Sequence, residues 1–147
     1  MGLARITKIL DQHSRIAIDT CVLIYYLEMY KTFGRSARAV IARLFKGLNE
    51  AVVSTVALSE VLVVPYREAR ELADRYYCLL QRVPNLRWIP VTVDIADLAA
   101  ELRAKRRLGT PDAIHLATAI EAGATLFVTN DRDLPVLRGV DYLILGE

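Results

Sequence analysis

The stretch Arg15-Ile-Ala-Ile-Asp19-Thr20-Cys-Val-Leu-Ile24 decides how this chain is expected to fold. Its first half is a short apolar, largely β-branched run that ends in an acid, which is typical of a buried strand. From Thr20 to Tyr30 the apolar residues recur at helical spacing. A strand that passes directly into a helix is the first part of a βαβ unit, so this stretch predicts an α/β fold.

Helices and strands alternate along the rest of the chain in the same way. Helices are predicted over residues 36–48, from 55 until Pro65 stops or bends the chain, and over 68–82, 95–108 and 112–122; strands are predicted over 51–54, 86–93, 125–129 and 142–145. No Gly/Ser linker or repeat divides the sequence, which predicts a single domain over residues 1–147. We expect three layers, with a central, mostly parallel sheet of about five strands flanked by helices.

Composition narrows the class of protein. Of the 147 residues, 54% are hydrophobic, yet no apolar run approaches the roughly 20 residues of a membrane span, and residues 1–12 hold no stretch long enough for a signal peptide. Cys21 and Cys78 lie far apart without a CxxC spacing, which favours two buried thiols in a reducing cytoplasm over a disulfide. The sequence therefore predicts a cytoplasmic protein that does not enter a membrane.

Four acidic residues stand beside apolar runs, where an uncompensated carboxylate costs free energy. They are Asp19, Glu60, Asp112 and Asp131. Asp19 and Asp131 fall just past predicted strands, Glu60 follows a third, and Asp112 starts a helix. Because the carboxyl ends of parallel strands line one edge of a sheet, we expect the four acids to converge there. A cluster of carboxylates without His or Cys ligands predicts a magnesium or manganese site.

Several neighbours of these acids are candidates for supporting roles. Thr20 and Thr129 directly adjoin acids and could hold a carboxylate or a metal-bound water. His115 shares a helix face with Asp112 and is expected to pack or to support a ligand rather than to bind the metal. Alternatives remain open, because Asp19 and Asp112 could simply start helices and Asp131 could be a turn residue.

With the four site acids set aside, 13 of the 17 acidic residues remain against 19 Lys and Arg, which leaves a basic outer surface that suits an anionic partner. The densest basic run, with Arg103, Lys105, Arg106 and Arg107, lies just before Asp112. It is either a solvated helix face or a set of contacts to the phosphates of a nucleic acid.

Four segments, in this order and spacing, resemble the PIN-domain nucleases, and among them the short VapC-type toxins of toxin–antitoxin pairs. They are Ile18-Asp19-Thr20-Cys-Val-Leu-Ile24, Ser54-Thr-Val-Ala-Leu-Ser-Glu60, Thr110-Pro-Asp112-Ala-Ile-His-Leu-Ala117-Thr-Ala119 and Val128-Thr129-Asn-Asp131-Arg-Asp133-Leu134. The resemblance places the family's acidic quartet on Asp19, Glu60, Asp112 and Asp131, with Asp133 as the alternative fourth acid. Leu134 departs from the commonest pattern, in which an aromatic residue follows.

The resemblance implies a PIN-like fold and a Mg²⁺- or Mn²⁺-dependent endoribonuclease. It further implies the toxin of a type II toxin–antitoxin system, commonly a homodimer, whose small antitoxin partner covers the active site. Two other functions stay open: a PIN-like nuclease of RNA processing outside any such pair, and a non-catalytic RNA-binding module. A phosphatase of the haloacid-dehalogenase type is disfavoured, because its mechanism needs a second Asp two residues after the first and position 21 is Cys.

Overall fold

Five parallel strands form one central sheet in the computed structural model, which describes residues 2–29 and 31–147. The strands are β1 (Arg15–Ile18), β2 (Glu50–Ser54), β3 (Leu86–Ile89), β4 (Leu126–Thr129) and β5 (Asp141–Ile144), in the order β3-β2-β1-β4-β5. In the centre of the sheet, Ile16 pairs with Ala51 of β2 and with Leu126 of β4. This confirms the expected parallel sheet of about five strands.

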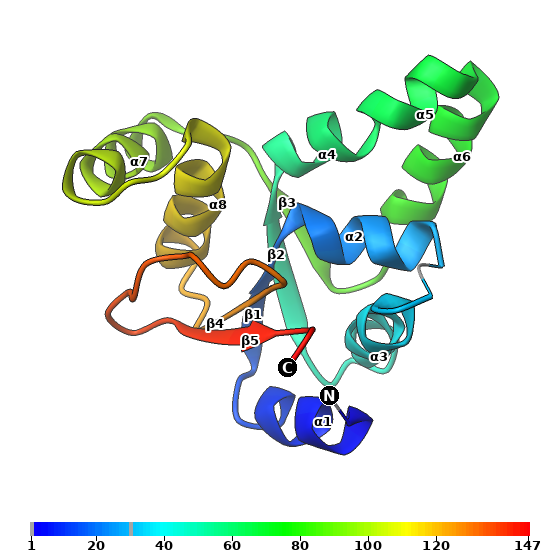
Figure 1. Cartoon of the computed structure of the whole chain (residues 1–147), viewed down its shortest axis with the longest axis horizontal. Coiled ribbons are helices and arrows are strands. Elements are labelled where there is room, and N and C mark those ends of the chain that lie inside the picture. Colours follow the sequence, from blue (N-terminus) through cyan, green and yellow to red (C-terminus); the bar gives the residue numbers. More distant parts are fainter. Residues whose placement is uncertain (1, 30) are drawn as a thin grey trace.

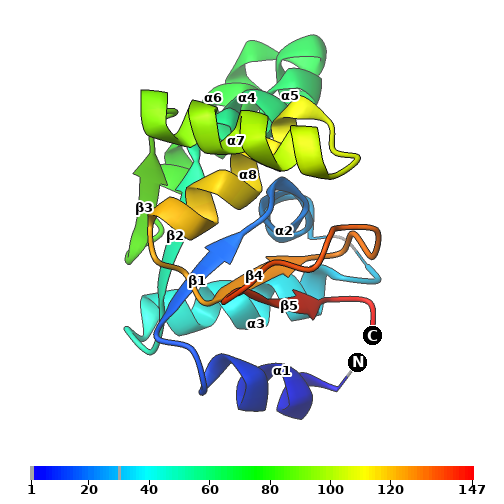
Figure 2. The ribbon, with the colours of Figure 1, turned by 90° about the vertical axis from the view of Figure 1, so that its left-hand side faces the viewer.

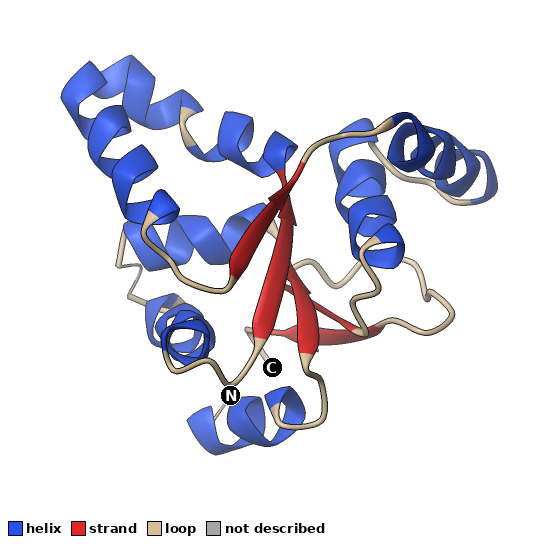
Figure 3. Cartoon of the chain, turned by 180° about the vertical axis from the view of Figure 1, so that it is seen from behind, coloured by secondary structure: helices blue, strands red, loops and turns tan. Residues whose placement is uncertain are grey.

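Helices cover both faces of the sheet, which gives the expected three layers (Figures 1 and 3). To one side lie α1 (Leu3–Leu10), α2 (Thr20–Leu27), α3 (Gly34–Phe45), α4 (Thr55–Val61), α5 (Val63–Glu68) and α6 (Arg70–Gln81). To the other side lie α7 (Val93–Lys105) and α8 (Thr110–Glu121).

The alternation of side chains along the central strand explains how both faces are filled. Ile16 and Ile18 are buried in the core that β1 shares with the helices α1 to α4. Ala17 points to the opposite face and packs in a second core with Phe127 and with Leu116 of α8. Helix α7 then covers α8, as Figure 2 shows from that side. A central strand buried on both faces reads as a continuous apolar run, as Ile16 to Ile18 do.

Several predicted element ends differ from the structure. Helix α7 ends at Lys105 rather than at 108, α8 begins at Thr110 rather than at 112, and Pro65 lies inside α5 rather than ending the helix before it. Helix α3 ends at Phe45 rather than at 48, because Gly47 adopts a φ of 68° and turns the chain. Strand β3 ends at Ile89 rather than at 93, because Pro90 has no N–H to donate and Thr92 caps α7. Helix α2 ends at Leu27, and the predicted end at Tyr30 lies outside the described residues.

Helix α1 is an element for which the sequence analysis made no prediction. Its residues Ile6 and Leu10, four positions apart, are fully buried in the core beside α3. The remaining positions of this short helix are mostly polar or exposed, so the apolar stripe is only two or three side chains wide. Such a stripe is too short to be recognised without knowing what it packs against.

The prediction of two buried thiols is wrong for one of them. Cys78 lies on an exposed position of α6, and Cys21 is half-buried; both are free cysteines. Period-3.6 spacing in α6 directs Ala73 and Leu80 inward instead, so Cys78 falls on the outer face. Among the described residues, no helix combines the length and apolar character needed to cross a membrane.

Candidate functional site

The predicted site lies where the order of the strands reverses. From β1 the chain adds β2 and β3 on one side and β4 and β5 on the other, so β1 and β4 flank the switch point at which open parallel sheets bind ligands. Asp19 directly follows β1, and Asp131 comes two residues after the end of β4. Glu60 lies in α4, which follows β2, and Asp112 lies in the first turn of α8.

Asp19 is held from both sides by hydrogen bonds. As the N-cap of α2, its Oδ1 accepts the backbone N–H of Thr20 at 2.7 Å. Its Oδ2 accepts the hydroxyl of the fully buried Thr129 at 2.7 Å. Capping and a fixed carboxylate therefore coexist in Asp19, so its capping role does not exclude a second role.

Thr129 also connects Asp19 to Asp131. The Thr129 hydroxyl oxygen accepts the backbone N–H of Asp131 at 3.1 Å, and the Oδ1 of Asp131 accepts the backbone N–H of Asp133 at 2.8 Å. Asp131 is half-buried and its side chain closes a turn by accepting the Asp133 N–H, whereas the Asp133 side chain is exposed. The geometry favours Asp131 over Asp133 as the fourth acid.

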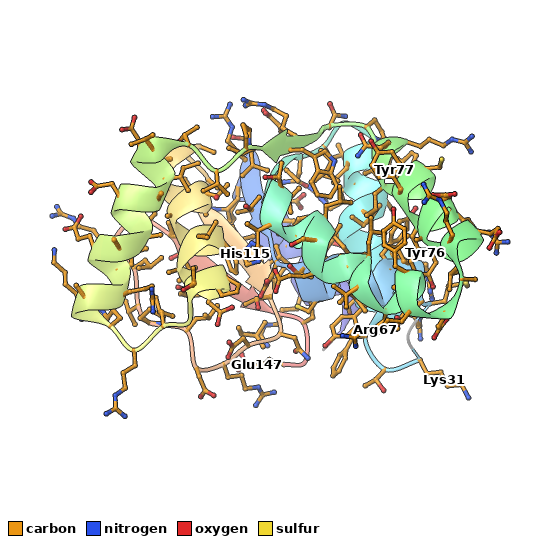
Figure 4. All side chains as sticks on the ribbon, turned by 90° about the horizontal axis from the view of Figure 1, so that it is seen from above. Lys31, Arg67, Tyr76, Tyr77, His115 and Glu147 are labelled. Carbon is orange, nitrogen blue, oxygen red and sulfur yellow. The ribbon has the colours of Figure 1, made fainter. Side chains whose placement is uncertain are left out.

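Glu60 is held by a second network that reaches across three elements. Its Oε1 accepts the hydroxyl of Thr20 at 2.9 Å and lies 2.6 Å from Nε2 of His115, which is 3.2 Å from the same hydroxyl. The Glu60 side chain is 36% exposed, so the expectation that this acid is costly because it is buried is wrong. The His115 side chain is only 3% exposed, and Figure 4 shows it in α8, facing α4.

The charges of the four acids meet at Asp112. Burial raises the pKa of Asp112 above its ordinary value, and the charges of Asp19, Asp131 and Glu60 raise it further, while His115 opposes them. A carboxyl group responds in this way only when the other three carboxylates are near enough to repel it. The structure therefore brings the four predicted acids into one electrostatic field, as expected from the carboxyl ends of parallel strands.

The donor chemistry of this field fits a hard divalent cation. Carboxylates and hydroxyls supply oxygen atoms only, and a cation would relieve the repulsion at Asp112. Burial, and next the charge of Asp19, raise the pKa of Cys21 to about 12, so this thiol is protonated at neutral pH when no metal is bound. Within residues 2–29 and 31–147, no three His, Cys, Asp or Glu side chains are close enough to form a ready-made metal cluster. Mg²⁺ keeps several water ligands, so its carboxylates need not meet at one point.

The basic run lies at the end of α7 and in the loop that leads to α8. Arg103 donates to the carbonyl oxygen of Leu108, and Lys105 pairs with Glu101 one turn earlier. These two side chains are engaged in local contacts. Arg106 and Arg107 are exposed in the loop itself, three to four residues before α8 begins.

Sequence reasoning missed the link between Asn130 and Tyr25 at the rim of the site. Asn130 stands between Thr129 and Asp131, and its amide donates to the Tyr25 hydroxyl at 3.3 Å. The Tyr25 ring also contacts Phe33, with centroids 5.1 Å apart. Tyr25 therefore packs and supports the loop after β4. Its position beside Tyr26 in an apolar helix gives no sign of this hydrogen bond.

The fold is similar to those of known proteins. A structure of a toxin–antitoxin complex from Klebsiella pneumoniae is 25% identical, with a TM-score of 0.66, over 85% of this chain and 94% of that one. VapBC2 from Rickettsia felis, bound to a DNA fragment from its promoter, is 14% identical, with a TM-score of 0.67, over 88% and 98% of the two chains. VapC20 from Mycobacterium tuberculosis, described as a sarcin–ricin loop cleaving toxin, is 19% identical, with a TM-score of 0.59, over 76% and 86%.

A comparison with curated proteins finds no match. The model of the PIN domain matches residues 16–140, which contain β2, β3, β4, all of β1 except Arg15, and all four acids of the site; β5 lies just beyond them. PIN-domain nucleases generally use divalent metal ions, in keeping with the oxygen-only donors described above. The chain therefore belongs to the PIN domain family.

Proposed function

We propose that this protein is a divalent-metal-dependent endoribonuclease that hydrolyses RNA phosphodiester bonds and acts as the toxin of a type II toxin–antitoxin pair. The observation that carries the proposal is the raised pKa of Asp112, which is caused by burial and by the charges of Asp19, Asp131 and Glu60 at the switch point of the sheet. Carboxylates that repel one another in a PIN domain are suited to hold Mg²⁺ or Mn²⁺.

The proposed ligands and their supports follow from the two hydrogen-bond networks. Asp19, Glu60, Asp112 and Asp131 would hold the cation, which when bound supplies a nucleophilic water and stabilises charge on the phosphate. Thr129 orients Asp19 and the start of the loop that carries Asp131. The chain itself thus contributes the placement of these acids.

The cleavage test uses purified protein, a defined single-stranded RNA and either Mg²⁺ or Mn²⁺. We expect cleavage that EDTA stops and that Asp19→Asn and Asp112→Asn abolish. Asp131→Asn and Asp133→Asn form a matched pair two residues apart, and only the first is expected to lower the rate. A parent protein that cuts no RNA with either metal, or an Asp19→Asn variant as active as the parent, would contradict the proposal.

Metal binding can be measured separately from cleavage by thermal unfolding. Mg²⁺ should raise the melting temperature of the parent, because the cation binds the folded site and relieves its repulsion. Glu60→Gln removes one charged ligand, so Mg²⁺ should raise the melting temperature of this variant by less. Equal shifts for both proteins would count against a shared metal site.

The toxin role draws support from the Klebsiella and Rickettsia neighbours, whose titles describe a toxin–antitoxin complex and VapBC2. An apolar surface also lies beside Glu60. Helix α5 exposes Val63, Val64 and Tyr66 next to a groove of about 420 Å³ between α4 and α5. A protein partner that covers this surface would bind along α4, the helix that carries Glu60. Expression should arrest growth, Asp19→Asn should abolish the arrest, and the product of a neighbouring small gene should relieve it.

The homodimer, the RNA contacts of the basic run and the cytoplasmic location belong to the same proposal. Size-exclusion chromatography with light scattering tests the dimer.

A PIN-like nuclease outside any toxin–antitoxin pair would cut RNA without arresting growth. A non-catalytic RNA-binding module would bind RNA equally well in EDTA and be indifferent to Asp112→Asn. The repulsion at Asp112 favours the catalytic alternative, because a module that only binds RNA has no use for clustered acids facing a phosphate.

A further inference from the structure

We propose that His115 and Thr20 are positioning residues that hold Glu60 by one oxygen and leave its other oxygen for the cation. This inference rests on the proposed function, because it concerns a ligand of the same site. It goes beyond that function by assigning a hydrogen-bonding task to the buried histidine.

The contacts place two polar groups on a single oxygen of Glu60. The Thr20 hydroxyl is 2.9 Å from Oε1, and Nε2 of His115 is 2.6 Å from the same atom. Both of these side chains are buried, with His115 at 4% exposure and Thr20 at 7%. The partners therefore come from rigid, packed positions in α8 and α2, while the acid that they hold is partly open to solvent.

The direction of these hydrogen bonds follows from the chemistry of the groups. An ionised carboxylate only accepts, so Nε2 of His115, at 2.6 Å from Oε1, must carry a hydrogen. Nδ1 of the same ring is buried and has no hydrogen-bond partner within the described part of the chain. A hydrogen on Nδ1 would be a buried, unsatisfied donor, which costs more than an idle lone pair. The structure therefore places a hydrogen on Nε2, where it can be donated to Glu60.

This arrangement explains why a histidine beside four acids is not itself a ligand. Its Nε2 is used on Glu60, and its Nδ1 lies buried without a hydrogen-bond partner among the described residues. A hard cation prefers oxygen to imidazole nitrogen, so the ring contributes most by orienting a carboxylate. Removing a partner that orients a metal ligand in this way typically lowers the metal affinity about 10- to 100-fold.

The substitutions separate hydrogen bonding from packing. His115→Phe keeps an aromatic ring but removes the donor, whereas His115→Gln can place an amide N–H near the position of Nε2. Thr20→Val removes the second donor with almost no change of shape. His13→Gln is the matched control, since His13 is the other histidine of the chain and bonds Thr125 at the opposite end of β1.

The measurement is Mn²⁺ affinity by isothermal titration calorimetry, without RNA. We expect His115→Phe and Thr20→Val to weaken Mn²⁺ binding about 10- to 100-fold, with His115→Gln and His13→Gln close to the parent. Equal affinity of His115→Phe and the parent would overturn the inference, as would a loss in His115→Gln as large as that in His115→Phe. A parent that binds no Mn²⁺ would instead overturn the proposed function.

A second measurement does not depend on any variant folding. In the metal-free parent labelled with ¹⁵N-histidine, long-range ¹H–¹⁵N spectra report which ring nitrogen carries the hydrogen. We expect these spectra to show a hydrogen on Nε2 of His115. The opposite tautomer would overturn the inference, because Nε2 could then donate nothing to Glu60.

Discussion

Replacing Thr129 by valine removes one hydroxyl from the centre of the first network and keeps the shape of the side chain. That hydroxyl donates to the Asp19 carboxylate and accepts the Asp131 N–H, and its residue is fully buried. A hydrogen bond to a charged group contributes about 1.5–3 kcal/mol, and a neutral one contributes about 0.5–1.5 kcal/mol. Because Asp19 is half-buried and water can replace part of the loss, we expect Thr129→Val to lower the free energy of unfolding by about 2–3 kcal/mol.

Thr118→Val provides the matched control for this prediction. Thr118 is equally buried, but its hydroxyl donates only to the Ile114 carbonyl oxygen one turn back in α8. That carbonyl already belongs to the helix, so the same substitution should cost only about 0.5–1 kcal/mol. Both variants bury the same added methyl group, and the difference between them isolates the bond to the charged Asp19.

The assay is urea unfolding at neutral pH in EDTA, followed by circular dichroism, with Thr129→Ser as a third variant that restores the hydroxyl. Thr129→Ser should recover most of what Thr129→Val loses. The reasoning is refuted if Thr129→Val and Thr118→Val lose the same free energy of unfolding. It is also refuted if Thr129→Ser is as unstable as Thr129→Val, since the loss would then come from packing.

Three further predictions address the field of the acids, the core and the basic loop. The raised pKa means that folded Asp112 holds its proton more tightly than unfolded Asp112, so the free energy of unfolding falls as pH rises from 3.8 through the folded pKa. Asp112→Asn should therefore stabilise the metal-free protein at pH 7. In denaturant titrations this gain should shrink as pH falls toward 3.8. Phe127→Ala should cost about 3–5 kcal/mol in the same assay because Phe127 is 1% exposed, whereas Phe45→Ala, at 55% exposure, should cost under about 1 kcal/mol. Alanine at both Arg106 and Arg107 should reduce the salt slope of RNA binding by about 0.7 per lost phosphate contact, measured in EDTA by fluorescence anisotropy; an unchanged slope would assign both to solvent.

The parallel sheet could be predicted because its strands are buried on both faces and each is followed by a recognisable helix. Ser54 shows how local this information is, since its hydroxyl caps α4 by accepting the Val56 N–H, just where a strand ends in a capping residue. The order of the strands could not be predicted. It depends on which side of β1 each βα unit packs, and that is decided by contacts between residues far apart in the sequence.

The candidate site shows the same division between local and distant information. The four acids could be placed on strand ends and helix starts from neighbouring residues alone. Our preference for Asp131 over Asp133 as the fourth acid rests on the contact of Asp131 with the Thr129 hydroxyl, which no spacing reveals. The role of His115 likewise depends on Glu60, 55 residues earlier in the chain. Sequence spacing predicts which residues are available, and packing decides what each one holds.

The two networks meet at one peptide, between Asp19 and Thr20, where β1 passes into α2. Asp19 is bonded to Thr129 at the end of β4, and Thr20 is bonded to Glu60 in α4. One junction therefore sets the positions of acids on both sides of the switch point. Because β1 is the central strand, with β2 and β4 as its neighbours, only its carboxyl end is adjacent to both halves of the site. A shift of this junction would misplace Asp19 and Glu60 together, so Thr129→Val and Thr20→Val should be less than additive in their effect on Mn²⁺ affinity. Full additivity in a double-mutant cycle would show that the two networks act independently.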